Sequence, residues 1–121
     1  MVARVQNNGL ANIVAALVTA NVARYLQWGT GSAAAASANV VTTAAAEART
    51  AGTLSAVTTT VTNDTLQNVG TITCASVGKT ISEVGVMDAS TAGNMIAYFD
   101  FTGIALLVGD SIAFTTQIKF V

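Results

Sequence analysis

The chain has 121 residues, of which five are basic, six are acidic and none is histidine, so its formal net charge is −1. Charged residues form 9% of the chain, against about 25% in an average soluble domain, and they make no basic patch for nucleic acid or an anionic membrane. Without histidine, the commonest general base and metal ligand is missing, and the sequence predicts no catalytic site, no metal and no cofactor.

The N-terminal region, residues 1–21, is predicted to be an arm followed by a short helix. A signal peptide is the alternative interpretation, but the apolar run is short and broken by asparagines. A membrane span would need about 20 apolar residues. Asn7 or Asn8 is the expected helix cap. We predict a core-packing helix, or in second place one docked on a neighbouring subunit. One apolar helical stripe is formed by Leu10, Ile13, Val14, Leu17 and Val18.

The next segment, Val22–Gly29, is aromatic and β-branched enough for a first strand. Trp28 is expected in the core, or at an interface if it is exposed. Gly29–Ser32 is glycine-rich, but it lacks the Gly-Lys-Ser/Thr ending of a phosphate-binding loop. The alanine-rich stretch Ser32–Ala48 is predicted to be a long surface connection whose small side chains lie against other protein.

Two further strands are predicted in the middle of the chain. Leu54–Thr62 alternates valine and threonine, Asn63 and Asp64 make a turn, and Gln67–Ala75 follows. The only cysteine, Cys74, excludes an internal disulfide framework and is expected to be a small buried residue.

The last segment, Lys79–Val121, shows three apolar-patterned strands separated by turns at Asp88–Asn94 and Gly109–Asp110. We predict that the three strands form an antiparallel β-meander. The whole chain, residues 1–121, is then a single mainly β domain. Its expected architecture is an antiparallel, jelly-roll-like β-sandwich with one short N-terminal α-helix. One face of the last strand carries Ile112, Phe114, Ile118 and Phe120.

Several acidic residues have two interpretations. Glu83 and Arg49 are predicted to form a structural ion pair, and the alternative is a catalytic acid with its tuning group. Asp88, Asp100 and Asp110 offer oxygen ligands of the kind that Ca²⁺ prefers. Turn formation explains Asp88 and Asp110 better, because aspartate bonds its own backbone at turns.

Read in order, GLANIVAAL, YLQWGTGSAAAAS, ISEVGVMDASTAGNMIAYFDF and LLVGDSIAFTTQIKF resemble a group of small structural proteins of tailed bacteriophages. That group includes tail-fibre or baseplate pieces and small β-sandwich cement proteins that clamp capsid subunits. The resemblance is carried by Gly29, Thr30, Gly31, Glu47, Arg49, Ile81, Glu83, Gly85, Val86, Met87, Asp88, Ala97, Phe101, Gly109, Asp110, Ser111 and Ile112.

The resemblance implies a virion protein that is assembled in the host bacterial cytoplasm and is not an enzyme. A capsid cement or decoration protein is the first expectation, since a charge-poor surface favours burial against neighbouring shell subunits. A tail-fibre, baseplate or receptor-binding module is the alternative. The expected partners are the major capsid protein or other virion proteins and further copies in a dimer or trimer. The candidate interface residues are Met1, Val2, Arg4, Val5, Asn7 and Trp28.

Overall fold

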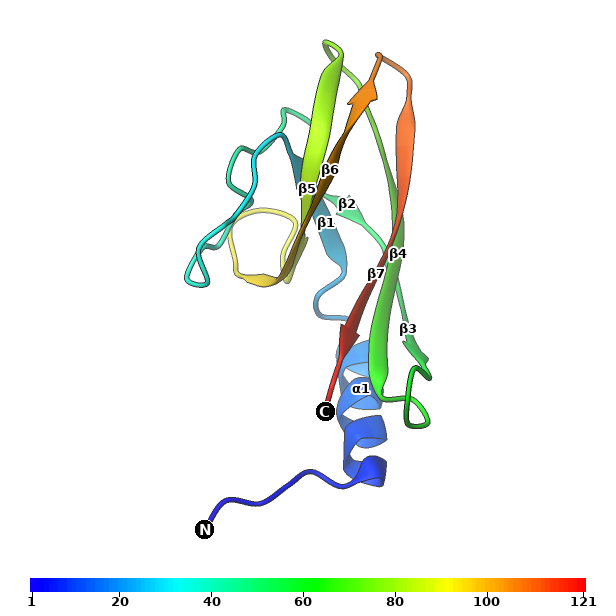
Figure 1. The fold of residues 1–121 in the computed structure, drawn as a ribbon. Coiled ribbons are helices and arrows are strands. Elements are labelled where there is room, and N and C mark those ends of the chain that lie inside the picture. Colours follow the sequence, from blue (N-terminus) through cyan, green and yellow to red (C-terminus); the bar gives the residue numbers. More distant parts are fainter.

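The computed structural model describes all residues from Met1 to Val121. It contains one helix near the N-terminus followed only by strands (Figure 1). In chain order the elements are α1 (Asn7–Ala20), β1 (Tyr25–Gly29), β2 (Thr50–Ala51), β3 (Thr53–Val57), β4 (Thr65–Thr73), β5 (Lys79–Met87), β6 (Met95–Leu106) and β7 (Ser111–Lys119).

The strands form two antiparallel sheets that share one hydrophobic core. One sheet has the order β2-β1-β5-β6 and the other β3-β4-β7. The core joins Leu26 and Trp28 of the first sheet to Leu66, Ile72 and Phe114 of the second, and all five are buried. The predicted mainly β sandwich with one short N-terminal helix is therefore confirmed.

Helix α1 lies at one end of the sandwich, against β3 and β4 (Figure 1). The predicted apolar stripe faces the protein, with Leu10 and Val14 buried at its centre. The predicted asparagine cap is wrong: Gln6 occupies the N-cap with an extended backbone and no side-chain hydrogen bond. At the other end Asn21 adopts the left-handed conformation (φ 56°) and its N–H donates to the carbonyl of Val18.

The predicted C-terminal meander is wrong at its last strand. β5 pairs with β6, but β7 leaves that sheet and pairs with β4, from Thr73 opposite Ser111 to Thr65 opposite Lys119. The turn between β6 and β7 explains the switch. Gly109 N–H donates to the carbonyl of Cys74 just after β4, and Cys74 N–H donates to the carbonyl of Asp110, each over 2.8 Å. This exchange holds β7 at the end of β4.

The predicted alternation along β7 is confirmed. Phe114 and Thr116 are buried, Ile112 and Ile118 are half-buried, and the residues between them are exposed. The predicted strand Leu54–Thr62 is too long, because β3 ends at Val57 and a turn follows.

The chain passes from one sheet to the other at Gly52, between β2 and β3. Gly52 N–H donates to the carbonyl of Arg24 over 2.6 Å. A side chain at Gly52 would overlap the Oδ1 atom of Asn68, whose Nδ2 donates to the carbonyl of Ala23 over 3.1 Å. The crossing therefore requires a residue without a Cβ atom.

Replacing Gly52 with alanine is expected to lower the free energy of unfolding by about 2 kcal/mol, because the new methyl group displaces a buried amide. Urea denaturation measures the change. Ala51→Val is the control, because Ala51 directly precedes Gly52 and is exposed. This substitution should change the free energy of unfolding by no more than about 0.5 kcal/mol. Equal effects of the two substitutions would contradict the close approach at Gly52.

Candidate functional site

The connection between β1 and β2, residues 30–49, lies over the outer face of the four-stranded sheet. Its anchor is Glu83 on β5, whose side chain is fully buried. The Glu83 carboxylate accepts hydrogen bonds from the N–H groups of Gly31 (3.1 Å), Thr42 (3.0 Å) and Thr43 (2.8 Å) and from the Tyr98 hydroxyl (2.8 Å). One carboxylate thus holds two separate parts of the connection, at Gly31 and at Thr42 and Thr43, against the sheet.

The donors around Glu83 compensate the cost of its burial. Burial alone would raise the pKa of Glu83, but the hydrogen bonds from Thr43, Tyr98, Thr42 and Gly31 together hold that pKa below its ordinary value. The carboxylate is therefore ionised at neutral pH although no cation is paired with it.

The Gly-Thr-Gly sequence has a structural explanation at this site. A Cβ atom at Gly29 would overlap the Glu83 carboxylate, and one at Gly31 would lie only 3.0 Å from its Oε1 atom. The two glycines allow the backbone to approach Glu83 closely. The loop that superficially resembles a phosphate-binding loop therefore surrounds a carboxylate of the protein itself.

The predicted ion pair between Arg49 and Glu83 is absent. Arg49 Nη1 instead donates to the carbonyls of Ala89 (2.9 Å) and Ala92 (2.6 Å) in the loop between β5 and β6. Backbone amides reach the buried Glu83 without the desolvation of a second charge, which an arginine there would require.

In the loop between β5 and β6, hydrogen bonds from Asn94 lower the pKa of Asp88.

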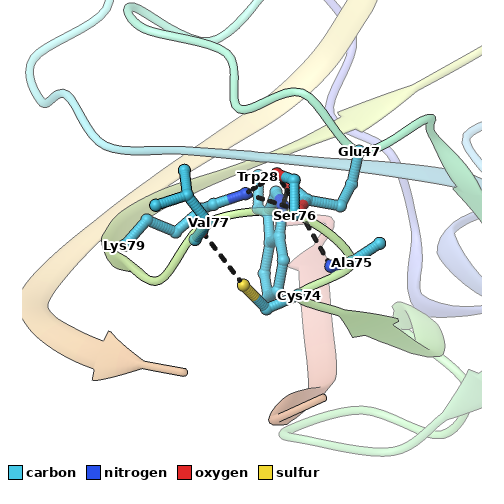
Figure 2. A network of polar contacts seen from close by, with 7 residues as sticks. All are labelled: Trp28, Glu47, Cys74, Ala75, Ser76, Val77 and Lys79. Carbon is cyan, nitrogen blue, oxygen red and sulfur yellow. Dashed lines mark hydrogen bonds and ion pairs between the residues drawn. The ribbon is translucent and has the colours of Figure 1, made fainter. Parts of the chain in front are cut away.

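A second anchor of the connection is Glu47 (Figure 2). Its carboxylate accepts hydrogen bonds from Trp28 Nε1 (3.0 Å) and Ala75 N–H (3.1 Å) and forms the only ion pair of the structure, with Lys79. Figure 2 shows Glu47 reaching across to the turn between β4 and β5, where Cys74 is fully buried as predicted.

The prediction that Trp28 is an interface residue is wrong, because its side chain is only 1% exposed. Its indole ring meets the Phe114 ring edge-on, with 6.4 Å between the centroids, and its N–H is satisfied by Glu47. The alternative interpretation of Trp28 as a core residue is confirmed. Sequence reasoning missed Lys79 as the partner of Glu47, since the two residues lie far apart in the chain and only the fold joins them.

The Glu47 network predicts acid sensitivity. Burial raises the pKa of Glu47, but hydrogen bonds from Lys79, from Trp28 and from backbone N–H groups outweigh it and lower the pKa from 4.5 to about 2. A group with a lowered folded-state pKa stabilises the fold above its unfolded-state pKa, and this stabilisation is lost as the pH falls. We expect the stability difference between the wild type and Glu47→Gln to shrink between about pH 4.5 and pH 2. Urea unfolding at a series of pH values measures this difference. If the free energies of unfolding of the two proteins differed by the same amount at every pH, the network would be contradicted.

A third buried carboxylate, Asp64, closes the turn that follows β3. Its two oxygen atoms accept hydrogen bonds from the N–H groups of Thr59 (3.0 Å), Thr60 (3.1 Å) and Val61 (3.0 Å), and the Thr65 hydroxyl donates to it over 2.9 Å. Burial opposes ionisation, but these donors lower the pKa of Asp64. The predicted turn at this position is confirmed, and its aspartate is structural.

The N-terminal arm, Met1–Gln6, precedes the helix and projects from the sandwich (Figure 1). Val2 is 98% exposed and Val5 44% exposed, and Arg4 also lies at the surface. Asn7 is exposed at the first turn of α1. These candidate interface residues are accessible, and their contact with a partner stays a prediction.

An apolar groove of about 470 Å³ opens between β6 and β7. The two strands belong to different sheets and are joined by a turn (Figure 1). Its walls combine side chains of the core face with threonines of the two strands. The lining residues include Phe101, Thr102 and Ile104 of β6 and Ile112, Phe114 and Thr116 of β7.

The remaining carboxylates are dispersed. Asp88 accepts from the N–H of Asn94 (2.7 Å), Asp110 from Leu107 N–H (2.8 Å), and Asp100 from Ala33 N–H (3.4 Å). No three His, Cys, Asp or Glu side chains are grouped so that they could hold a metal ion.

No helix combines the length and the apolar character needed to cross a membrane.

Comparison with known families gives one match. Residues 2–118 fit the family model described as Podophage GP4 fiber I protein gp80. The matched range includes α1, β1 to β6 and nearly all of β7, and with them both carboxylate anchors, Glu47 and Glu83. No curated protein and no solved structure matches the chain.

Proposed function

The chain belongs to the podophage GP4 fiber I protein gp80 family, and from this we propose that it is a building block of a fibre on a podophage particle. The predicted resemblance to small structural proteins of tailed phages is confirmed, so the protein is a phage virion structural protein. The family description favours the fibre alternative over the capsid cement role that was the first expectation from the sequence.

The proposed mode of action is protein–protein contact without catalysis. The buried carboxylates of Glu47, Asp64 and Glu83 support this view. Each accepts hydrogen bonds from N–H and O–H groups of its own chain, which gives it a structural role. The exposed arm and the open apolar groove provide surface for neighbours in an assembly. Other virion proteins are the proposed partners.

The position of the subunit in the particle tests the proposal. We expect cryo-electron microscopy of purified virions to place density for this fold in a fibre, and antibody labelling to mark the same appendages. Labelling spread evenly over the capsid shell, with a copy number that follows the number of shell subunits, would favour the cement role and overturn the fibre assignment.

A further inference from the structure

Two unpaired strand edges face each other in this sandwich. β6 is the last strand of the four-stranded sheet, and β7 is the last strand of the three-stranded sheet. The two strands share a turn and then diverge (Figure 1). Each is paired on one side only, to β5 and to β4 respectively.

The core is left open between these edges. Ile104 of β6 lies opposite Ile81 of β5, so their side chains share the core face of the sheet. Ile81 is completely buried, but Ile104 remains 44% exposed and lines the groove. Beside this pair the register shifts, and β6 carries two more residues than β5 between the pairs Ile81–Ile104 and Glu83–Asp100. The chain itself does not cover the apolar surface that results.

Apart from the register shift described above, no charge or proline protects the free edge of β6 from pairing with another strand. Natural edge strands are commonly blunted by lysine, other charges or proline. From Phe101 to Leu106 the sequence reads FTGIAL, without a charge or a proline. Thr102, Gly103 and Ala105 are exposed along this edge. An added strand would gain backbone hydrogen bonds here and cover the groove with its apolar face.

The N-terminal arm has the properties of such a strand. In an extended conformation, Met1, Ala3 and Val5 lie on one face, which is apolar. Six extended residues span roughly 20 Å, the length of the six-residue edge from Phe101 to Leu106. The arm is cationic through Arg4, whereas no basic residue lines the groove and the exposed Asp100 directly precedes the free edge.

The arm of the same molecule starts at the wrong end of the sandwich to fill the groove. Arg4 and Val5 line a separate hollow with Phe120 and Val121, beyond the end of β7. The four residues before Val5 span at most roughly 14 Å. Along the strand, the groove wall begins at Thr116, roughly 16 Å from Val121, and continues to Ile112, roughly 30 Å away. The arm of the same molecule is therefore too short to place Met1, Ala3 and Val5 along the groove, whereas the arm of another molecule can.

We propose that the arm of one copy adds as an edge strand to β6 of a second copy, with Met1, Ala3 and Val5 filling the groove. The free edge, the uncovered core face, the matching length and the opposite charges carry this inference. The proposed contact does not depend on the fibre assignment, because it rests only on the edge of β6, the groove and the arm of this chain.

The test uses the full-length chain and three variants, each checked for folding by circular dichroism. One variant lacks residues 1–6 and keeps the groove; the second, Ile104→Lys, keeps the arm and places a charge in the groove. Ile96→Lys is the matched control, since Ile96 is 49% exposed on the same strand but does not line the groove. Light scattering after size exclusion measures the mass across a concentration series.

We expect the wild type and Ile96→Lys to have at least twice the monomer mass of 12.2 kDa, and the other two variants to be monomeric. Mixing the arm-deleted chain with Ile104→Lys should restore a complex, because one partner brings an intact arm and the other an intact groove. A monomeric wild type, undiminished association without the arm, or a mixture that forms no complex would each overturn the proposal.

Discussion

Replacing Phe114 with aspartate is expected to abolish folding. Phe114 is 8% exposed, and its ring contacts Trp28 edge-on and Phe101 at 6.2 Å between centroids. The substitution removes this packing and places an unpaired carboxylate at the junction of the two sheets. The two effects together should cost more than about 5 kcal/mol, a large part of the total stability of a domain of this size. Circular dichroism and urea denaturation measure the loss.

The control for this prediction is Ala113→Asp. Ala113 is the preceding residue of β7, and its side chain is exposed on the opposite face of the sheet. The same charge there should change the free energy of unfolding by no more than about 0.5 kcal/mol. A soluble, cooperatively unfolding Phe114→Asp protein would show that the inward face of β7 is assigned incorrectly.

Replacing Glu83 with glutamine is expected to destabilise the protein by about 3 kcal/mol and to release the connection between β1 and β2. The amide has the size of the carboxylate, but its NH₂ group would face N–H donors, leaving at least one of Thr42 and Thr43 without an acceptor. Urea denaturation measures the stability. Hydrogen exchange at the amides of Gly31, Thr42 and Thr43 reports the release directly.

The matched control is Asp100→Asn on the neighbouring strand. Asp100 also accepts from the connection, at Ala33 N–H, but it is exposed and the bond is long, at 3.4 Å. Its substitution should cost less than about 0.5 kcal/mol. If Glu83→Gln were as mild as this control, the connection would be held by its own packing and not by the carboxylate.

The errors in the sequence-based predictions have a common physical origin. Arg49 and Glu83 are the charged residues that a search for opposite charges selects, but the fold gives Glu83 amide donors and pairs Glu47 with Lys79. An aromatic residue such as Trp28 suits a core or an interface equally well. Its burial between the sheets shows that it is a core residue. Each of these outcomes depends on residues that are distant in the chain.

Short-range periodicity and turn chemistry were sufficient to predict α1, the inward face of β7 and the turns at Asp64, Asp88–Asn94 and Gly109–Asp110, because each depends on neighbours within a few residues. Which sheet receives β7 could not be read in this way, since the alternation is the same beside β6 or beside β4. The bonds between Cys74 and the turn after β6 decide it, and they also leave the two edges unpaired. Residue order thus determined which side of each element is apolar, and tertiary contacts alone determined what that side meets.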